Sequence, residues 1–341
     1  MNKVDELLDG IFSSDRPPPR RPSGLVRSVK DVAQDYVDFA LNPQNRFRTG
    51  YQWLDAAMKG GTAPGEVTTF AAGANTGKTT VMCNLGANNT ETPMIFFTIE
   101  MPEILVVARL YAITFDEEFR SLEERLKGGD RPLEGRMRGE LGERLPMFGL
   151  VGVGAPDLAT MKDAIQDYEQ AFQAHPKIAM IDYLDLMAPN SENVEAVKSK
   201  YVGLREFGKA LDLGVIVAHQ IKREVLEGRH GSPLRFTDTR YAGESESDHL
   251  IGWYRRVNDP KVMRNALLHA EHRWTIHVQV LKTRSGEPQA VIEGHEMGWN
   301  PETLRVTDTP DLEELVPEVV TEELPADKAR DFFADQLKEA T

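Results

Sequence analysis

Short apolar runs recur along the middle of the chain, and longer stretches with helical periodicity separate them. Rich in Val, Ile, Phe and Thr, these runs predict strands because such residues favour buried sheet positions. The expected strands are 67–71, 94–99, 177–181, 214–218, 249–254, 275–281 and 289–293. The expected helices are 78–88, 102–115, 157–174 and 194–212. This alternation predicts an α/β fold with a mostly parallel central sheet and helices on both faces.

Three other segments flank or interrupt the alternating region. Residues 1–24 are rich in proline and arginine and suit neither helix nor sheet, so we expect a flexible tail. Residues 25–41 repeat apolar side chains with helical spacing and Pro43 follows, so we expect a linker helix within 25–44. Such a helix must dock on its own body or on a neighbour. Residues 117–144 are charged and helix-prone, which indicates an excursion.

The charge of the chain is uneven. The sequence has 54 acidic and 40 basic residues, a net charge of −14, and residues 307–341 account for −8 of it. We therefore expect a domain at 45–306 followed by an acidic tail at 307–341. Bulk acidity disfavours coating DNA by charge alone but leaves room for a local basic surface. The tail is expected to be a solvated end or, alternatively, a docking peptide for a replication protein.

The composition excludes several classes of protein. With 40% hydrophobic and 28% charged residues, the chain suits a soluble globular protein. No apolar run of about 18 residues predicts a membrane span, and the N-terminus lacks the apolar core of a secretory signal. The single cysteine, Cys83, excludes an intrachain disulfide and a cysteine-built zinc site. We therefore expect a cytoplasmic protein.

The clearest chemical signal lies at 72–80, where Ala-Gly-Ala-Asn-Thr-Gly-Lys-Thr-Thr joins an expected strand to an expected helix. In this context backbone N–H groups and the helix N-terminus cradle phosphates. We expect ATP to be bound by Gly73, Ala74, Asn75, Thr76, Gly77, Lys78, Thr79 and Thr80. Lys78 would reach the β- and γ-phosphates, and the Thr79 hydroxyl would hold Mg²⁺. Ala72 replaces the usual first glycine of the motif.

Two carboxylates stand at the ends of expected inner strands. Asp182 and Glu100 would lie at the edge of the sheet, where ligands bind in folds of this kind. Asp182 would accept bonds from the Mg²⁺ shell, and Glu100 would act as the general base that polarises the attacking water. The alternatives are a turn aspartate and a first-turn glutamate that suits its helix dipole.

Polar residues near two later strands complete the candidate catalytic set. Of the pair after the fourth expected strand, we favour Gln220 as a γ-phosphate contact, while His219 is a candidate for an ordinary buried histidine. Lys282 and Arg284 stand two apart on an expected strand, so their side chains share one face. They would enter a neighbouring subunit's site as an arginine finger does, or alternatively form a solvated basic edge.

Several motifs, taken in order, resemble the RecA-like ATPase domain of the DnaB-type replicative hexameric helicases. They are 48–55 with 64–66, 99–102, 181–187, 237–248 and 282–286. The resemblance covers roughly residues 25–306, and alanine at position 72 is common in that family. It implies a RecA-like P-loop NTPase fold, ATP hydrolysis with Mg²⁺, a homo-oligomer expected to be a hexameric ring, and single-stranded DNA as a partner. The linker helix would then pack on an adjacent subunit.

The chain departs from the family pattern in two places. Only some 45 residues precede the ATPase domain, where the family has a helical domain that engages primase, so we expect a compact viral or phage form acting in the host cytoplasm. Glu244, Glu246 and Asp248 also stand where a DNA-facing loop would be neutral or basic. The DNA-binding candidates are Lys222, Arg223, Arg235 and Arg240, and the alternative is an exposed charged loop.

We expect an ATP-dependent DNA helicase or translocase that hydrolyses ATP at subunit interfaces and moves on single-stranded DNA during replication. One alternative is a RecA-like recombination or repair ATPase, or an enzyme that processes branched DNA, with nuclease activity. Another is a loader or regulator that uses the nucleotide as a switch. The three differ in their products: strand displacement with ATP turnover, strand exchange or cleavage, and ATP binding with negligible turnover.

Overall fold

The computed structural model describes residues 27–42, 44–74, 76–189, 193–239, 246–284 and 294–310. Residues Met1–Asn45 and Arg46–Thr341 form two separate compact units. The predicted proline- and arginine-rich tail lies outside the described residues, as does the predicted acidic tail beyond residue 310. In the part of the chain that is described, no helix has the length and apolarity needed to cross a membrane.

The first unit contains helix α2 (Val29–Leu41). The helix begins at Val29 and not at residue 25, because the Ser28 side chain caps it by accepting a hydrogen bond from the backbone N–H of Asp31 at 3.1 Å. None of its residues is buried. Its large apolar side chains are exposed: Val29, Val32, Tyr36, Val37 and Leu41. The helix therefore presents an uncovered apolar stripe.

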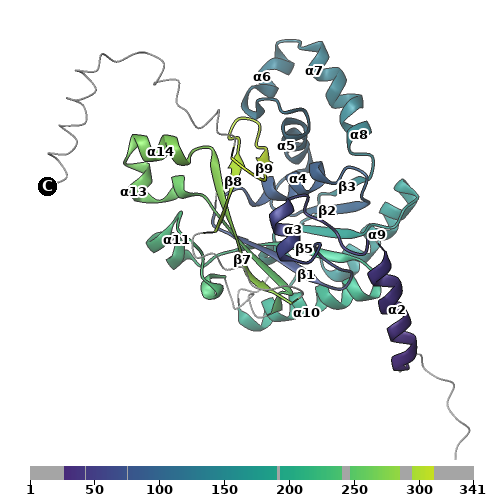
Figure 1. The fold of residues 1–341 in the computed structure, drawn as a ribbon. Coiled ribbons are helices and arrows are strands. Elements are labelled where there is room, and N and C mark those ends of the chain that lie inside the picture. The colour runs from purple at the N-terminus through teal and green to yellow at the C-terminus, as the bar shows by residue number, and fades with distance from the viewer. Residues whose placement is uncertain are drawn as a thin grey trace, which may run out of the picture. The chain divides into compact units, whose positions relative to one another are not determined.

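The second unit is built on a nine-stranded sheet of described residues in the order β3-β2-β4-β5-β1-β6-β7-β8-β9 (Figure 1). The strands are β1 (Val67–Ala72), β2 (Met94–Thr98), β3 (Phe148–Val151), β4 (Ile178–Asp182), β5 (Gly214–Gln220), β6 (His249–Tyr254), β7 (Thr275–Thr283), β8 (His295–Trp299) and β9 (Val306–Thr307). The first six pair in parallel, whereas β7, β8 and β9 add to the sheet antiparallel. The predicted mostly parallel α/β fold is confirmed.

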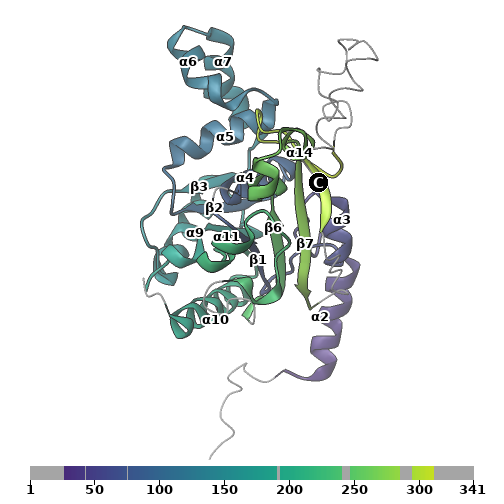
Figure 2. The same ribbon diagram turned by 90° about the vertical axis from the view of Figure 1, so that its left-hand side faces the viewer.

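The inner strands supply two hydrophobic cores at once. Along β2, Met94 and Phe96 face one core while Ile95 and Phe97 face the other, because successive strand residues point to opposite faces. Helices α3 (Gln52–Ala57), α4 (Lys78–Asn88) and α5 (Glu103–Phe115) pack on the first core. Helices α9 (Leu158–Phe172) and α10 (Val194–Ala210) pack on the second. Figure 2 shows α3 on one side of the sheet and α9 and α10 on the other.

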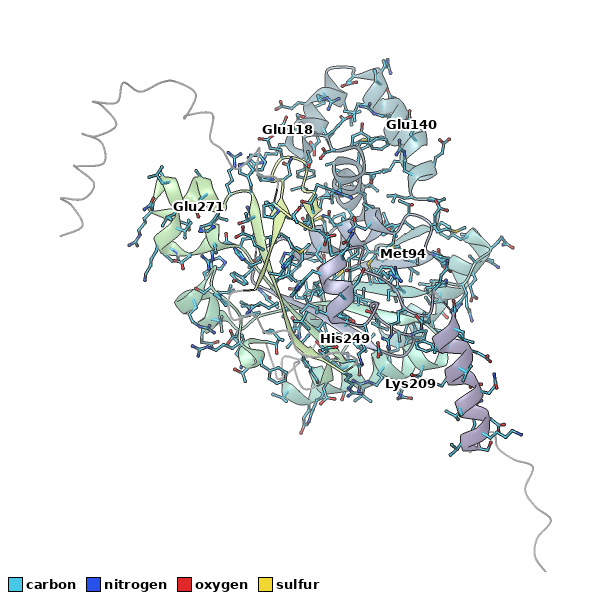
Figure 3. All side chains as sticks on the ribbon, viewed as in Figure 1. Met94, Glu118, Glu140, Lys209, His249 and Glu271 are labelled. Carbon is cyan, nitrogen blue, oxygen red and sulfur yellow. The ribbon has the colours of Figure 1, made fainter. Side chains whose placement is uncertain are left out.

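The charged excursion after α5 is helical, as predicted. It contains η1 (Phe119–Ser121), α6 (Leu122–Lys127), α7 (Arg131–Gly135), the π-helix η2 (Arg136–Glu140) and α8 (Leu141–Arg144). Glu117 accepts a bond from Arg125 at 2.7 Å and also contacts Arg136. Figure 3 shows its many charged side chains, with Glu118 and Glu140 labelled. Ion pairs around one carboxylate therefore organise a segment whose outer surface is polar.

The remaining short helices join the later strands. They are η3 (Leu184–Leu186), α11 (Arg223–Arg229), η4 (Phe236–Asp238), η6 (Arg256–Asn258), α13 (Pro260–Met263) and α14 (Ala266–His272). The four predicted helices and the first six predicted strands are confirmed to within two residues at each end. The strands β3, β8 and β9 were not predicted, and the predicted strand at 289–293 lies outside the described residues.

Candidate active site

The predicted phosphate loop joins the end of β1 to the start of α4. Gly77 precedes the helix with φ of 91°, a left-handed conformation that favours glycine. A Cβ atom added there would also lie 3.3 Å from the Trp299 ring. The loop thus stands between strand and helix, the arrangement that points backbone N–H groups at a phosphate. Asn75 lies outside the described residues.

Lys78 is held inside the loop. Its side chain is largely buried, and its Nζ donates a hydrogen bond to the carbonyl oxygen of Gly73 at 3.1 Å. Burial lowers the pKa of Lys78, and the negative charges of Asp182 and Glu100 oppose that shift. A cation placed at the mouth of the loop in this way is suited to an anionic phosphate.

Asp182 and Thr79 meet at the end of β4. The Thr79 hydroxyl donates to Asp182 Oδ2 at 2.5 Å, and Asp182 is 1% exposed. Burial raises the pKa of Asp182 to about 6, although the Thr79 hydrogen bond acts in the opposite direction. The other carboxylate oxygen, Oδ1, is buried without a hydrogen-bond partner. Mg²⁺ takes oxygen ligands, so this orphaned oxygen beside a hydroxyl fits the predicted magnesium site.

A cavity of about 450 Å³ opens over the phosphate loop. Its lining residues are Ala74, Gly77, Lys78, Thr79, Thr80, Glu100, Met101, Pro102, Leu105, Tyr183 and Gln220. The structure therefore brings Glu100 and Gln220 to the phosphate loop, although 22 to 142 positions of sequence separate them from Lys78. Met101, Leu105 and Tyr183 also line the cavity and were not singled out from the sequence.

A cavity of similar size, about 470 Å³, lies against β3 and α9. Its walls are mainly apolar, and Glu103 and Asp167 are its charged residues. None of the motif residues lines it. The chemistry of nucleotide binding is therefore concentrated in the smaller cavity over the phosphate loop.

His219 is a buried histidine that lies outside the cavity lining. Its side chain is 0% exposed, and Nδ1 lies 3.1 Å from the Tyr201 hydroxyl. Tyr201 in turn lies 3.0 Å from the Thr69 hydroxyl on β1. His219 thus belongs to a polar chain that joins β5, α10 and β1, and Gln220 is the member of the pair that reaches the cavity.

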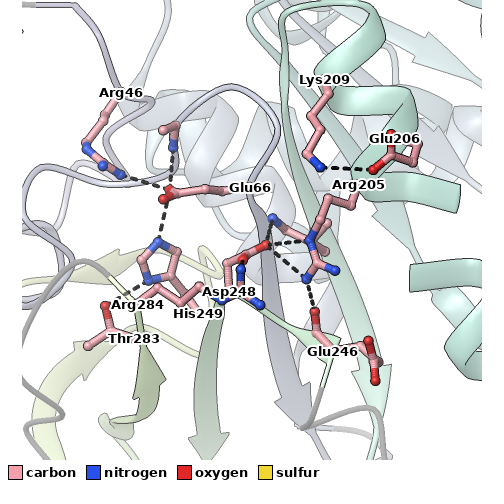
Figure 4. Close-up of polar contacts among 12 residues, drawn as sticks. Arg46, Glu66, Arg205, Glu206, Lys209, Glu246, Asp248, His249, Thr283 and Arg284 are labelled. Atoms are coloured by element: carbon pink, nitrogen blue, oxygen red, sulfur yellow. Dashed lines mark hydrogen bonds and ion pairs between the residues drawn. The ribbon is translucent and has the colours of Figure 1, made fainter. Parts of the chain in front are cut away.

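Lys282 and Arg284 lie toward the opposite edge of the sheet from the phosphate loop. Lys282 pairs with Leu250 near the start of β6, and Arg284 lies just beyond the last residue of β7. The Arg284 guanidinium is 3.0 Å from Asp248 Oδ1 (Figure 4). Asp248 also accepts a bond from the backbone N–H of Val67, the first residue of β1.

Asp248 has a different position from the one its sequence context indicated. It was expected in a DNA-facing loop, but it is 2% exposed and lies between Val67, Arg205 and Arg284. Glu246 likewise contacts Arg205 through its backbone carbonyl. These two acidic residues therefore organise the amino edge of the sheet, and their charges do not argue against a basic DNA surface elsewhere.

The DNA-binding candidates are only partly described. Lys222 Nζ donates to the carbonyl oxygen of Thr237 at 2.5 Å, which ties it to η4. Arg235 is exposed, and the neighbouring Phe236 is 41% exposed. The Arg223 side chain and the whole of Arg240 lie outside the described residues. Phe236 was not singled out from the sequence, although an aromatic beside an arginine is a typical nucleic-acid contact.

Comparison with known proteins agrees with this geometry. The sequence model of the family described as DnaB-like helicase C terminal domain matches residues 47–307. The structure is similar to the solved ATPase domain of a DnaB-like helicase, with a TM-score of 0.70 and 16% identity, covering 83% of this chain and 99% of that one.

A second similar structure is that of a DnaB-like replicative helicase studied with its interactions with primase. Its TM-score is 0.65 at 16% identity, and the match covers 89% of this chain and 71% of that one. No curated protein sequence matches the chain. The structural matches support the RecA-like fold, and the family match spans most of the chain. The chain therefore belongs to the DnaB-like helicase C-terminal domain family, a family of replicative helicase-type, ATP-hydrolysing enzymes.

Proposed function

We propose that this protein is an ATP-dependent DNA helicase or translocase that hydrolyses ATP between subunits of a homo-oligomer and moves on single-stranded DNA during replication. The observation that carries the proposal is the division of its candidate catalytic groups between two edges of one sheet. Lys78, Thr79, Glu100, Asp182 and Gln220 gather at one edge. Lys282 and Arg284 belong to the other.

The two groups are too far apart to serve one site within a single chain. Arg284 is joined to Asp248, which is bonded to Val67 at the start of β1, whereas the phosphate loop follows Ala72 at the end of that strand. At about 3.3 Å per residue the strand separates the two by about 17 Å. That exceeds the reach of an arginine side chain, so we infer that Arg284 acts on the nucleotide of a neighbouring subunit.

Each residue at the phosphate loop has a distinct chemical task in this proposal. The loop N–H groups and Lys78 bind the β- and γ-phosphates, and Thr79 and Asp182 hold Mg²⁺, which when bound neutralises charge on those phosphates. Glu100 orients the attacking water and accepts its proton. Gln220 contacts the γ-phosphate and reports its loss along β5.

The proposal assigns DNA binding to a local surface. Lys222, Arg223, Arg235 and Arg240 would contact the phosphates of single-stranded DNA within a ring of subunits, expected to contain six. A few such contacts supply salt-dependent affinity even when the whole chain is acidic. Raising the salt concentration should therefore weaken DNA binding more than it weakens ATP binding.

Mixing two inactive variants tests the shared site. Lys78→Ala removes the phosphate contact of a subunit's own site, and Arg284→Ala removes the group supplied to the next subunit. Each variant alone should lose ATP turnover by about 100-fold or more. Co-assembled in equal amounts, they should recover part of the wild-type turnover, because some interfaces then pair an intact Lys78 with an intact Arg284.

Two controls make the mixing experiment decisive. Glu118→Ala, an exposed change on the helical excursion, should leave turnover unchanged. The double variant that carries both substitutions should restore no turnover when it is mixed with either single variant, because no interface then has both groups. Absence of recovery in a verified mixed oligomer of the two single variants would contradict a shared site, and turnover that ignores single-stranded DNA would contradict the motor.

A further inference from the structure

A cluster of two histidines and one glutamate lies apart from the nucleotide cavity. His272 ends α14, His277 lies on β7, and Glu296 lies on β8. His277 and Glu296 are direct partners in the antiparallel pairing of β7 with β8, so their side chains project on the same face of the sheet. None of the three lines the cavity over the phosphate loop.

The separations within the cluster suit a bound cation better than a hydrogen bond. One donor atom from each of the three residues lies within 4.8 Å of the other two. His277 Nε2 is 3.6 Å from Glu296 Oε2, which is too long for a hydrogen bond. Two nitrogen or oxygen ligands of a tetrahedral zinc ion, each bonded at about 2.1 Å, lie about 3.4 Å apart.

The ring of His277 is buried and fixed. His277 is 4% exposed and His272 is 9% exposed. The His277 ring stacks on Tyr254 with 5.0 Å between ring centres, which sets its orientation. Its Nε2 atom is buried and has no hydrogen-bond partner. A buried polar nitrogen aimed at a carboxylate and a second imidazole, with nothing bonded to it, has the arrangement expected of a metal ligand.

The charges around the cluster define what it can bind. Glu296 supplies one negative charge, whereas Arg256 lies close enough to lower the pKa of His277 after burial has already done so. Two neutral imidazoles and one carboxylate favour zinc and similar transition metals over Mg²⁺ or Ca²⁺, which prefer oxygen ligands. The nearby arginine weakens the attraction for any cation, so the site selects through its nitrogen ligands.

We propose that His272, His277 and Glu296 bind a divalent transition-metal ion of the zinc class, with water as a fourth ligand. The bound ion would join the end of α14 to the β7–β8 pair. This site is independent of the proposed motor function, because ATP and its Mg²⁺ use a different set of residues.

Zinc binding to the full-length protein tests the proposal directly. The protein is stripped with a chelator, returned to excess Mg²⁺ to fill the magnesium site, and titrated with Zn²⁺ against a chromophoric competitor. One Zn²⁺ per chain is expected. Co²⁺ in place of Zn²⁺ should give the visible absorption of a four-coordinate site, a signal that a loosely bound surface ion does not give.

Variants at the exposed side of the cluster keep the test interpretable. Glu296→Gln preserves shape and should weaken zinc binding by more than about tenfold, as should His272→Asn. The matched control is His269→Ala, an exposed histidine of the same helix that lies outside the cluster. Circular dichroism checks that each variant is folded.

The thermal midpoint gives a second readout. Zn²⁺ should raise the Tm of the wild type and of the His269 variant but leave that of Glu296→Gln unchanged. The proposal is wrong if the stripped protein shows no saturable zinc binding. It is equally wrong if Glu296→Gln and His272→Asn both bind zinc as tightly as the wild type does.

Discussion

At the scale of single residues, Glu66 connects three parts of the domain. Its Oε2 accepts hydrogen bonds at 2.8 Å from both Arg46 and the backbone N–H of Ala63, and lies 3.2 Å from His249 Nε2 (Figure 4). Burial raises the pKa of Glu66, but the bonds from His249 and Ala63 and the charge of Arg46 outweigh it and bring the pKa to about 2. The ionised carboxylate is therefore the form that the fold stabilises.

The low pKa of Glu66 predicts a defined loss of stability in acid. The folded pKa is below the ordinary value of 4.5, so this contribution is present above about pH 4.5 and is lost as the pH falls toward 2. Glu66→Gln should lower the free energy of unfolding at pH 7 by about 2 kcal/mol and flatten its decline between pH 4.5 and pH 2.5. Urea unfolding across this range measures both effects.

Glu206→Gln provides the matched control for Glu66. Glu206 also pairs with a basic residue, Lys209 at 2.9 Å, but both side chains are largely exposed. Such pairs contribute little, so this variant should change the free energy of unfolding by less than about 0.5 kcal/mol. Equal effects of the two substitutions would contradict the central position given to Glu66.

At the scale of secondary-structure elements, local capping fixes where the long helices begin. The Asp157 side chain accepts bonds from the backbone N–H and the hydroxyl of Thr160, both at 2.8 Å, at the start of α9. These bonds lower the pKa of Asp157. The helix then continues with Met161, Ile165 and Tyr168 buried against the sheet.

Removing this cap should destabilise the domain by a small, specific amount. We expect Asp157→Ala to lower the free energy of unfolding by about 1 kcal/mol, because the first-turn N–H group loses its partner. Asp163→Ala, an exposed change within the same helix, should be neutral or slightly stabilising. Thermal or urea unfolding compares the two, and equal losses would show that the cap contributes nothing specific.

Elements with strong local signals could be predicted, and edge elements could not. β2 and β4 are buried at every position because both of their faces are covered, which made their apolar runs visible in the sequence. β3 is a four-residue edge strand containing Gly149, and β9 has two residues, so neither carries a pattern long enough to recognise. Their place in the sheet comes from neighbours distant along the chain.

The same distinction applies to the candidate site. The phosphate loop is one continuous segment, and its position between a strand and a helix was predictable. The position of Asp248 depends on Val67, which is 181 positions away, and on Arg284, so its burial could not be inferred from the acidic text around it. The His272, His277 and Glu296 cluster was missed for the same reason, since its residues meet only when β7 pairs with β8.

At the scale of the whole molecule, α2 is a separate helix whose apolar stripe is exposed in a single chain. A helix of this length is marginal alone in water, so its stripe needs a covering surface. That it packs on an adjacent subunit stays a prediction. Val32→Asp combined with Tyr36→Asp should shift the protein from oligomer toward monomer in light scattering.

The opposite side of the same helix offers a control for the assembly experiment. Gln34→Asp changes a residue between the two apolar positions without touching the stripe, and it should leave the measured mass unchanged. Unchanged mass in the doubly charged variant would show that α2 does not hold the subunits together. Removal of residues 1–44 should agree with the double substitution.

The placement of Arg284 and the phosphate loop at opposite edges of one sheet has a consequence for how activity depends on concentration. Under the proposed sharing, a closed ring completes as many sites as it has chains, whereas an open row leaves one nucleotide at its end without the neighbour's arginine. Dilution would then reduce turnover per chain although every residue is intact. ATP binding, which needs mainly one chain, would survive to lower protein concentration than hydrolysis does.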